Sequence, residues 1–134
     1  MNKTPISDLD LLLKSLDPVL NPGVFAFVSV NNAGQLASVH VIASIVEPEG
    51  FSAVIVESDA ISLGLPILFR AGWITLKVNS DLQAVGLTAA FSAALGRAGI
   101  SCNVVAGAYH DHVFVPIARV TDAMQVLKNL QNAS

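Results

Sequence analysis

The chain of 134 residues is poor in cysteine, in charge and in long apolar runs, and each shortage excludes a class of protein. Its one cysteine, Cys102, rules out an internal disulfide and suits a reducing compartment, so we expect a cytoplasmic location. The 7 Lys and Arg residues form no basic cluster, which argues against nucleic acid as a partner. Apolar runs stop well short of the ~18 residues that a membrane span needs. The polar, acidic start is unlike a signal peptide.

Motifs for catalysis are also missing. There is no Gly-rich phosphate loop and no dinucleotide-binding fingerprint. The acidic residues are scattered at the ends of expected elements, without the paired geometry of acid–base catalysis. Cys102 alternates with Val104 and Ala106 along an expected strand, which indicates a buried structural thiol and no nucleophile. We therefore expect no enzyme activity and no cofactor.

Apolar residues, by contrast, are abundant. Hydrophobic residues make up 53% of the chain and charged residues 13%. Such a chain can bury a core, and its length fits one compact unit or two very small modules that share a core. A small domain normally needs charge to cover its surface. This deficit predicts that part of the surface is hidden in a homodimer or a higher oligomer.

The second half of the sequence has the clearer pattern. Trp73–Val78 alternates like a half-buried strand, and Ser80 with Gln83 matches a capping box. A helix is expected from there to about Ala98, where Gly99 ends it. Two short strands and a final helix complete this half, at residues 101–106, 112–117 and 121–130.

The first half is predicted to begin with a short helix, about Asp8–Leu16, capped by Ser7 or Thr4. Asn21–Gly23 is expected to form a turn after it. The pattern then predicts strands at 24–30, 36–46 and 51–57, a very short helix from Ser58 to Gly64, and an extended segment at 67–71.

A resemblance to a known family comes from Gly86, the run Ala94–Ile100 and Asn103, together with the runs 101–107 and 110–116. These residues resemble the ACT domain, a small βαββαβ module. The chain is most similar to small bacterial two-module ACT proteins, and more distantly to the ACT domains of aspartate kinases and cytosolic arginine sensors. The resemblance implies an α+β, ferredoxin-like fold, with a truncated module at 1–66 and a second module at 67–134. It also implies a regulatory role.

The order of elements leaves each half one strand short. No residues remain for a fourth strand after the last helix, and the first half begins with a helix where a strand is needed. We therefore predict two interlocked modules with antiparallel sheets, bridged by residues 67–78. An edge left open by a missing strand would favour pairing with another copy.

Two candidate site regions follow from the residues. The resemblance implies an effector near the loop after the first strand, here Asn79–Leu87, at an interface between two modules. The N–H groups at a helix N-terminus suit a carboxylate, and Asp81 is placed to receive an ammonium group. Capping of the helix alone would also explain Ser80 and Asp81.

The second region is the polar run Tyr109–His112, which the resemblance places at the ligand. A metal site would need a third ligand such as His40, which the spacing does not supply. A polar turn whose side chains bind backbone groups is the simplest alternative.

The sequence thus predicts a stand-alone regulatory module that binds a small ligand, an amino acid by resemblance, at an ACT–ACT interface. The alternative is an assembly protein without a ligand. No metal is assigned. The candidate ligand-binding residues are Asn79, Ser80, Asp81, Val85, Gly86, Leu87, Asn103, Tyr109, His110, Asp111 and His112.

Overall fold

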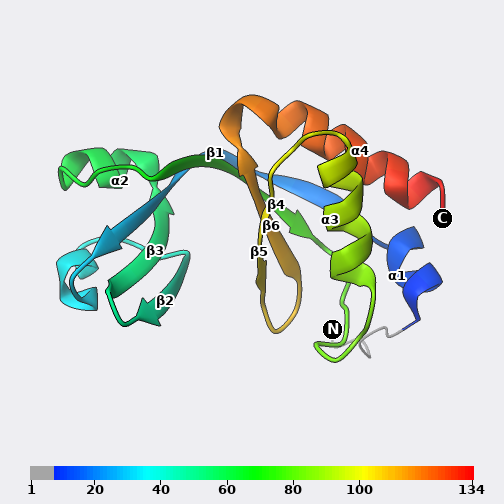
Figure 1. The fold of residues 1–134 in the computed structure, drawn as a ribbon, viewed down its shortest axis with the longest axis horizontal. Coiled ribbons are helices and arrows are strands. Elements are labelled where there is room, and N and C mark those ends of the chain that lie inside the picture. Colours follow the sequence, from blue (N-terminus) through cyan, green and yellow to red (C-terminus); the bar gives the residue numbers. More distant parts are fainter. Residues whose placement is uncertain (1–7) are drawn as a thin grey trace. The chain divides into compact units, whose positions relative to one another are not determined.

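A computed structural model describes residues 8–134, which form strands and helices of unequal length (Figure 1). The strands are β1 (Pro18–Val30), β2 (Ala43–Glu47), β3 (Gly50–Val56), β4 (Phe69–Leu76), β5 (Asn103–Ala106) and β6 (Asp111–Pro116). The helices are α1 (Leu9–Lys14), α2 (Glu57–Ser62), α3 (Leu87–Arg97) and α4 (Val120–Asn132), with 3-10 turns η1 (Ala33–Leu36) and η2 (Ile117–Arg119).

The strands are hydrogen-bonded in the order β2-β3-β1-β4-β6-β5. The chain divides into an N-terminal unit, Pro22–Gly72, and a C-terminal unit, which combines Trp73–Ser134 with the described residues up to Asn21. The long strands β1 and β4 therefore each contribute to both units. The N-terminal unit has the chain order βαββαβ, in which η1 and α2 are the helical segments. The C-terminal unit follows the same order from β4 to α4, and the start of β1 takes the place of the last strand. The fold is therefore α+β and ferredoxin-like, with two interlocked modules.

The pairing of β1 with β4 shows which strand each half of the chain lacks. The first strand of the N-terminal unit is β1, so that half lacks its fourth strand, which β4 supplies; our expectation of a missing first strand was wrong. The C-terminal unit takes its fourth strand from the start of β1. Lys77 N–H donates to the Asp17 carbonyl (3.1 Å) and Val78 N–H to the Leu16 carbonyl (3.3 Å), which continues this pairing past the strand ends.

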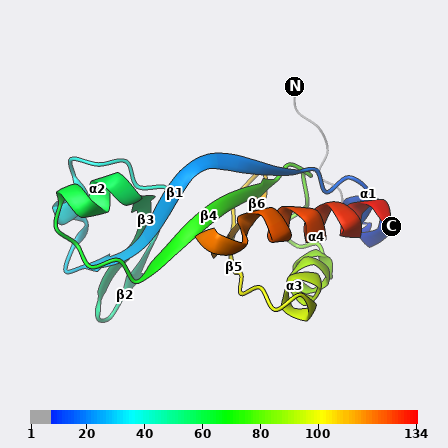
Figure 2. The ribbon, with the colours of Figure 1, turned by 90° about the horizontal axis from the view of Figure 1, so that it is seen from above.

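The C-terminal unit has its core between β4, β6 and three helices. Figures 1 and 2 show α3 and α4 beside these two strands. Gln131 on α4 holds the end of α1, because its side chain accepts from Asp17 N–H and donates to the Lys14 carbonyl, both at 3.0 Å. The buried core residues are Leu12, Leu16, Ile74, Leu76, Val78, Leu87, Phe91, Leu95, Ile100, Val113, Val115, Ala123 and Leu127.

The N-terminal unit has a smaller core of its own. It joins alternate residues of β1 and β3 to one residue each of η1 and α2: Ala26, Val28, Val30, Ala53, Ile55, Leu36 and Ala60. The β1–β3 pairing is antiparallel, with Val28 opposite Ala53. The β2–β3 pairing is also antiparallel and ends at Glu47 opposite Gly50.

Three expectations about the first half are corrected. Asn21–Gly23 lies inside β1 and forms no turn. The strand expected at 36–46 is short, because η1 and an irregular segment occupy its beginning and only Ala43–Glu47 pairs with β3. The cap of α1 is Asp8, whose side chain accepts from Leu11 N–H at 3.0 Å. Thr4 and Ser7, the caps we expected, lie outside the described residues.

Candidate functional site

The loop between β4 and α3 differs from the sequence prediction. The helix α3 begins at Leu87, six residues later than the capping box implied, so Ser80 and Gln83 do not cap it. Instead the Asp81 side chain accepts from Gln83 N–H at 2.9 Å, and Ala84 N–H donates to the Asp81 carbonyl at 2.9 Å. Asp81 thus organises a local turn. The sequence pattern was misleading because the same short side chains favour both helix caps and turns.

The true N-cap of α3 is Gly86. Its φ of +103° lies in the left-handed region, which glycine adopts without a steric cost. A Cβ added here would lie 3.1 Å from Leu9 Cδ2, so α1 packs closely on this position. Among the described residues no side chain caps this end of the helix. The N–H groups of the first turn precede the first intrahelical bond, which Ala90 N–H donates to the Gly86 carbonyl at 2.9 Å.

The remaining loop residues differ in exposure. Asn79 and Ser80 are half-buried, whereas the Val85 side chain is 85% exposed. Leu87 is buried in the core between α3 and the sheet, so it fixes the helix start. Of the loop, Asp81 and the backbone at Gly86 are the groups whose chemistry suits a charged ligand.

The β5–β6 hairpin reaches this loop through His110. The Nδ1 atom of His110 lies 3.4 Å from the carbonyl oxygen of Val78, the last residue before the loop. The hairpin turn closes with Gly107 N–H donating to the His110 carbonyl at 2.9 Å. Tyr109, at the tip of the turn, is largely exposed. The structure therefore brings part of the predicted polar run next to the predicted loop.

Next along the strand, His112 lies in a network of side chains from three strands. Its Nδ1 atom lies 3.0 Å from Trp73 Nε1 and 3.1 Å from Thr75 Oγ1, both on β4. Asn21 of β1 completes the network, because its Nδ2 donates to Thr75 Oγ1 (2.9 Å) and to the Trp73 carbonyl (3.2 Å). Phe114 stacks against Trp73 with ring centroids 6.1 Å apart.

This network occupies the sheet face that points away from the helices. Ile74, Leu76, Val113 and Val115 face α3 and α4, so the alternating residues Trp73, Thr75, His112 and Phe114 face the other way. Asn103 pairs with Phe114 across β5–β6 and shares their face. Trp73 and Thr75 alternate with Ile74 and Leu76 in the sequence, and this pattern could have placed both on the sheet face of His112. Asn21 was missed because it was assigned to a turn.

Asp111 is buried, with 8% of its surface exposed, and lies opposite Ala106 at the start of β6. Burial raises the pKa of its carboxyl group, and the neighbouring His112 partly offsets this effect. The pKa of His112 is lowered, first by burial and next by the charge of His110. The charge of Asp111 acts to raise the pKa of His112, and the charge of Lys77 acts to lower it further. Both shifts favour the neutral form of the group concerned.

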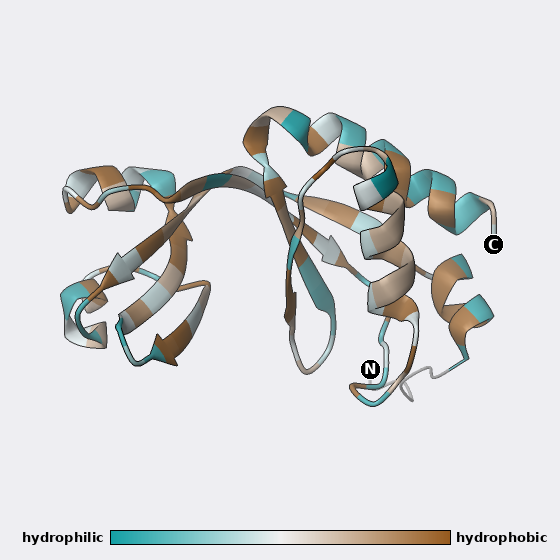
Figure 3. Ribbon diagram, in the orientation of Figure 1, coloured by the Kyte–Doolittle hydropathy of each residue, from teal (hydrophilic) through white to brown (hydrophobic). Residues whose placement is uncertain are grey.

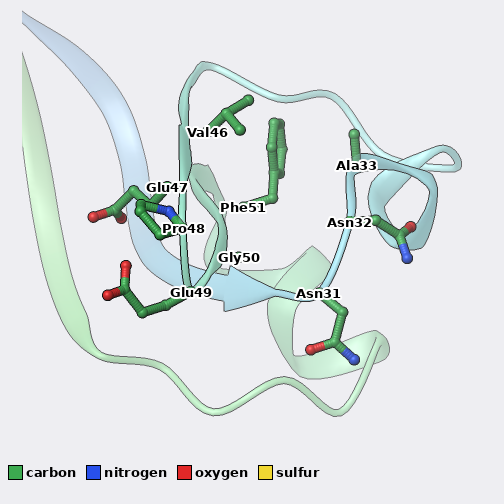
Figure 4. Close-up of a pocket in the computed structure, with 9 residues that line it drawn as sticks. All are labelled: Asn31, Asn32, Ala33, Val46, Glu47, Pro48, Glu49, Gly50 and Phe51. Carbon is green, nitrogen blue, oxygen red and sulfur yellow. The ribbon is translucent and has the colours of Figure 1, made fainter.

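A separate cavity lies in the N-terminal unit, outside every residue predicted for the site. It has a volume of about 360 Å³ and is lined by the end of β1 and the β2–β3 turn: Asn31, Asn32, Ala33, Val46, Glu47, Pro48, Glu49, Gly50 and Phe51. Figure 4 shows Phe51 between Val46 and Ala33, with the carboxylates of Glu47 and Glu49 turned to the far side of the hairpin. The polar groups do not converge on the apolar part of the cavity.

Other candidate chemistries find little support in the described part of the chain. Within residues 8–134 no three His, Cys, Asp or Glu side chains lie together as metal ligands would. Burial raises the pKa of the Cys102 thiol, which keeps it protonated and unreactive. Over the same residues, no helix is both long enough and apolar enough to cross a bilayer.

Comparison with known families agrees with the two-unit architecture. An ACT domain model matches residues 4–72, and a second ACT domain model matches residues 68–129. The chain belongs to the ACT domain family. The two matches overlap at the start of β4, the strand that serves as the last of one ACT module and the first of the next.

Solved structures extend the comparison. A Vibrio cholerae protein of unknown function, described as a possible transport protein, is 43% identical, with a TM-score of 0.84 over 92% of this chain and 95% of that one. The regulatory subunit of aspartate kinase from Thermus thermophilus has 10% identity and a TM-score of 0.70, over 87% and 97% of the two chains. A protein from Agrobacterium tumefaciens has 16% identity and a TM-score of 0.64, over 85% and 87%. The last two likenesses concern the fold alone. No curated protein matches this chain.

Proposed function

We propose that this ACT protein is a stand-alone regulatory module that binds a free amino acid at the loop between β4 and α3. ACT domains are in general regulatory, ligand-binding modules, and this chain carries two of them. We add to this general role a ligand class, the free amino acids, and a site. We assign no catalytic step and no cofactor to the chain, so ligand binding would act through a partner protein or through a change of assembly.

The observation that carries the proposal is the start of α3, which no described side chain caps and which follows Asp81 by six residues in the chain. Gly86 has no side chain to cap α3, and no other side chain within residues 8–134 does so. The N–H groups of the first turn of α3 therefore suit the carboxylate of a ligand. Asp81 uses one carboxylate oxygen for Gln83 N–H. The second oxygen could receive an ammonium group. A free amino acid is the smallest common ligand that carries both charges on one carbon.

The hairpin supports the same location. His110 contacts the Val78 carbonyl, so the turn at Gly107–His110 lies against the beginning of the loop. Tyr109 and Val85 are exposed on these two segments. They offer apolar surface for the side chain of a ligand or for a second ACT module closing over it, as expected for a site at an ACT–ACT interface.

The first test is a thermal-shift screen against the twenty amino acids, followed by calorimetry on any that bind. A ligand at ~100 times its Kd adds roughly 2.7 kcal/mol of stability, which raises Tm by several degrees for a domain of this size. Asp81→Asn keeps the oxygen that accepts from Gln83 N–H but removes the charge. We expect it to weaken binding about 10-fold, because a charge-assisted hydrogen bond becomes a neutral one.

The matched control is Asp122→Asn, which removes the same charge from an exposed position on α4. It should leave the affinity within about twofold. Equal affinity of wild type and Asp81→Asn would remove Asp81 from the site. Absence of any shift with all twenty amino acids would reject the ligand class.

A second candidate function, assembly without a ligand, is favoured by one observation. The edge strand β2 exposes Ile45 and Val46, at 63% and 81% of their surface. Figure 3 shows this strand among the most hydrophobic parts of the ribbon. We infer a homodimer or higher oligomer in either case, in the cytoplasm, without nucleic acid or membrane as a partner.

A further inference from the structure

We propose that His112 is a proton-operated lock: while neutral, its side chain joins β6 to β4, and when protonated it loosens the β5–β6 hairpin. This regulation of the ligand loop rests on the function proposed above. The lock itself does not, because it is built from side chains of the free protein.

The protonation state of His112 follows from its partners. An indole N–H can only donate a hydrogen bond. Trp73 Nε1 lies 3.0 Å from His112 Nδ1, so Nδ1 must be the acceptor and carries no proton. The neutral ring therefore has its proton on Nε2. That atom faces the hairpin turn, because a Cβ added at Gly107 would lie 3.3 Å from it.

Protonation would remove the acceptor that the network needs. The Thr75 hydroxyl could rotate and accept from a protonated Nδ1, while it still accepts from Asn21. Trp73 has no such freedom, because its indole N–H can only donate and would then point at the N–H of a protonated Nδ1. Two donors facing each other at this distance repel, so a proton on Nδ1 opposes the closed network.

Burial and the charged groups around His112 together determine the direction in which its pKa is shifted. His110 on the hairpin and Lys77 after β4 both disfavour a positive charge on the ring, and Asp111 favours it. Burial acts in the same direction as the two cations, so the pKa of His112 lies below its ordinary value. The folded protein thus resists protonation, and acid must open the network to protonate it.

The hairpin connects this lock to the proposed ligand loop. His112 pairs with Val105 across β5–β6, and two residues earlier His110 contacts the Val78 carbonyl beside the loop. Release of Trp73 would loosen the start of β6 and with it the His110 contact. The closed form, with neutral His112, and the loosened form, with protonated His112, therefore differ at the proposed ligand site. We expect the ligand to bind these two forms with different affinities.

The experiment follows the indole N–H resonance of the single tryptophan by ¹H–¹⁵N NMR between pH 8 and pH 4.5. We expect one resonance that shifts with a midpoint below 6.5, together with the His112 ring signals, and a His112 tautomer protonated on Nε2. In His110→Gln the shift should persist with a somewhat higher midpoint. In His112→Gln, whose amide oxygen can accept from Trp73, the indole resonance should no longer follow this titration.

An indole resonance that stays constant while the His112 ring titrates would overturn the lock. Affinity for an amino acid found in the thermal-shift screen should fall by about 5-fold or more from pH 7.5 to pH 5.5 in wild type. It should fall much less in His112→Gln. Equal falls in both proteins would overturn the coupling to the ligand loop. If no amino acid binds, the proposed function fails, and the indole titration still decides whether the lock exists.

Discussion

At the scale of single residues, the polar side chains of β6 have unequal roles. His112 bonds to Trp73 and Thr75 on the sheet face away from the helices, whereas Asp111 is buried at the beginning of the strand. The sequence grouped both with Tyr109 and His110 as one polar run. Alternation along a strand separates neighbouring residues onto opposite faces, so a run of polar letters does not make one site.

Asp111 gives a prediction that concerns pH. Because the pKa of its carboxyl group is raised in the folded state, the folded protein holds this proton more tightly than the unfolded chain. The free energy of unfolding should therefore fall as pH rises from about 4 through the folded pKa. Asp111→Asn, which mimics the neutral form, should gain stability relative to wild type across this range and keep the gain at neutral pH.

The measurement for Asp111 is the Tm of both proteins between pH 3.5 and pH 7.5, with Asp122→Asn as a control on an exposed side chain. A gap between wild type and Asp111→Asn that is constant with pH would mean that burial does not perturb this carboxyl group. A variant less stable than wild type at neutral pH would mean that Asp111 accepts a hydrogen bond which outweighs its burial.

At the scale of elements, the sequence located most strands and helices but misplaced their boundaries. The predicted strand at 51–57 and helix at 121–130 agree closely with β3 and α4, where periodicity is strong. The start of α3 was misplaced because Asp81 forms a turn and Gly86 caps the helix. Pro22 and Gly23 suggested a turn, yet β1 continues through both. Tertiary pairing outweighs local preference at these positions.

The edge strand β2 supplies the prediction for assembly. An exposed apolar edge offers unpaired backbone groups to another chain, and a lysine on such an edge opposes pairing. Wild type should sediment as a dimer or larger species, and Val46→Lys should shift it towards the monomer. Ile61→Lys places the same charge on an exposed apolar position of α2 and is the matched control.

Analytical ultracentrifugation over a range of concentrations measures the oligomeric state of wild type and of both lysine variants. A monomeric wild type at every concentration would contradict self-association. An equal effect of the two lysine substitutions would show that β2 is not the surface involved.

At the scale of the whole molecule, the shared strands make the two ACT modules dependent on each other. The C-terminal module takes its fourth strand from the start of β1, and the N-terminal module takes its own from β4. Separate fragments 1–66 and 67–134 each lose a strand and expose a sheet edge. We expect each fragment alone to lack cooperative unfolding, and a mixture of the two to recover part of the native circular dichroism.

Calorimetry and the NMR dispersion of each fragment test this dependence. A fragment 67–134 with native dispersion and a cooperative transition would contradict it, because its sheet would then be stable without the strand from β1. The full chain, measured under the same conditions, is the reference.

By itself the sequence determined the family resemblance, through short motifs in its second half, and the resemblance implied the fold class. The order of elements predicted the interlocking, because motifs and element order can both be read along the chain. It also identified Asp81, Gly86 and the run Tyr109–His112 as candidates. The tertiary structure alone decided which strands are shared, where α3 begins, and that His112 bonds to Trp73, 39 residues away. These depend on contacts between distant segments, where the pairing of strands and the burial of polar groups outweigh local residue preference.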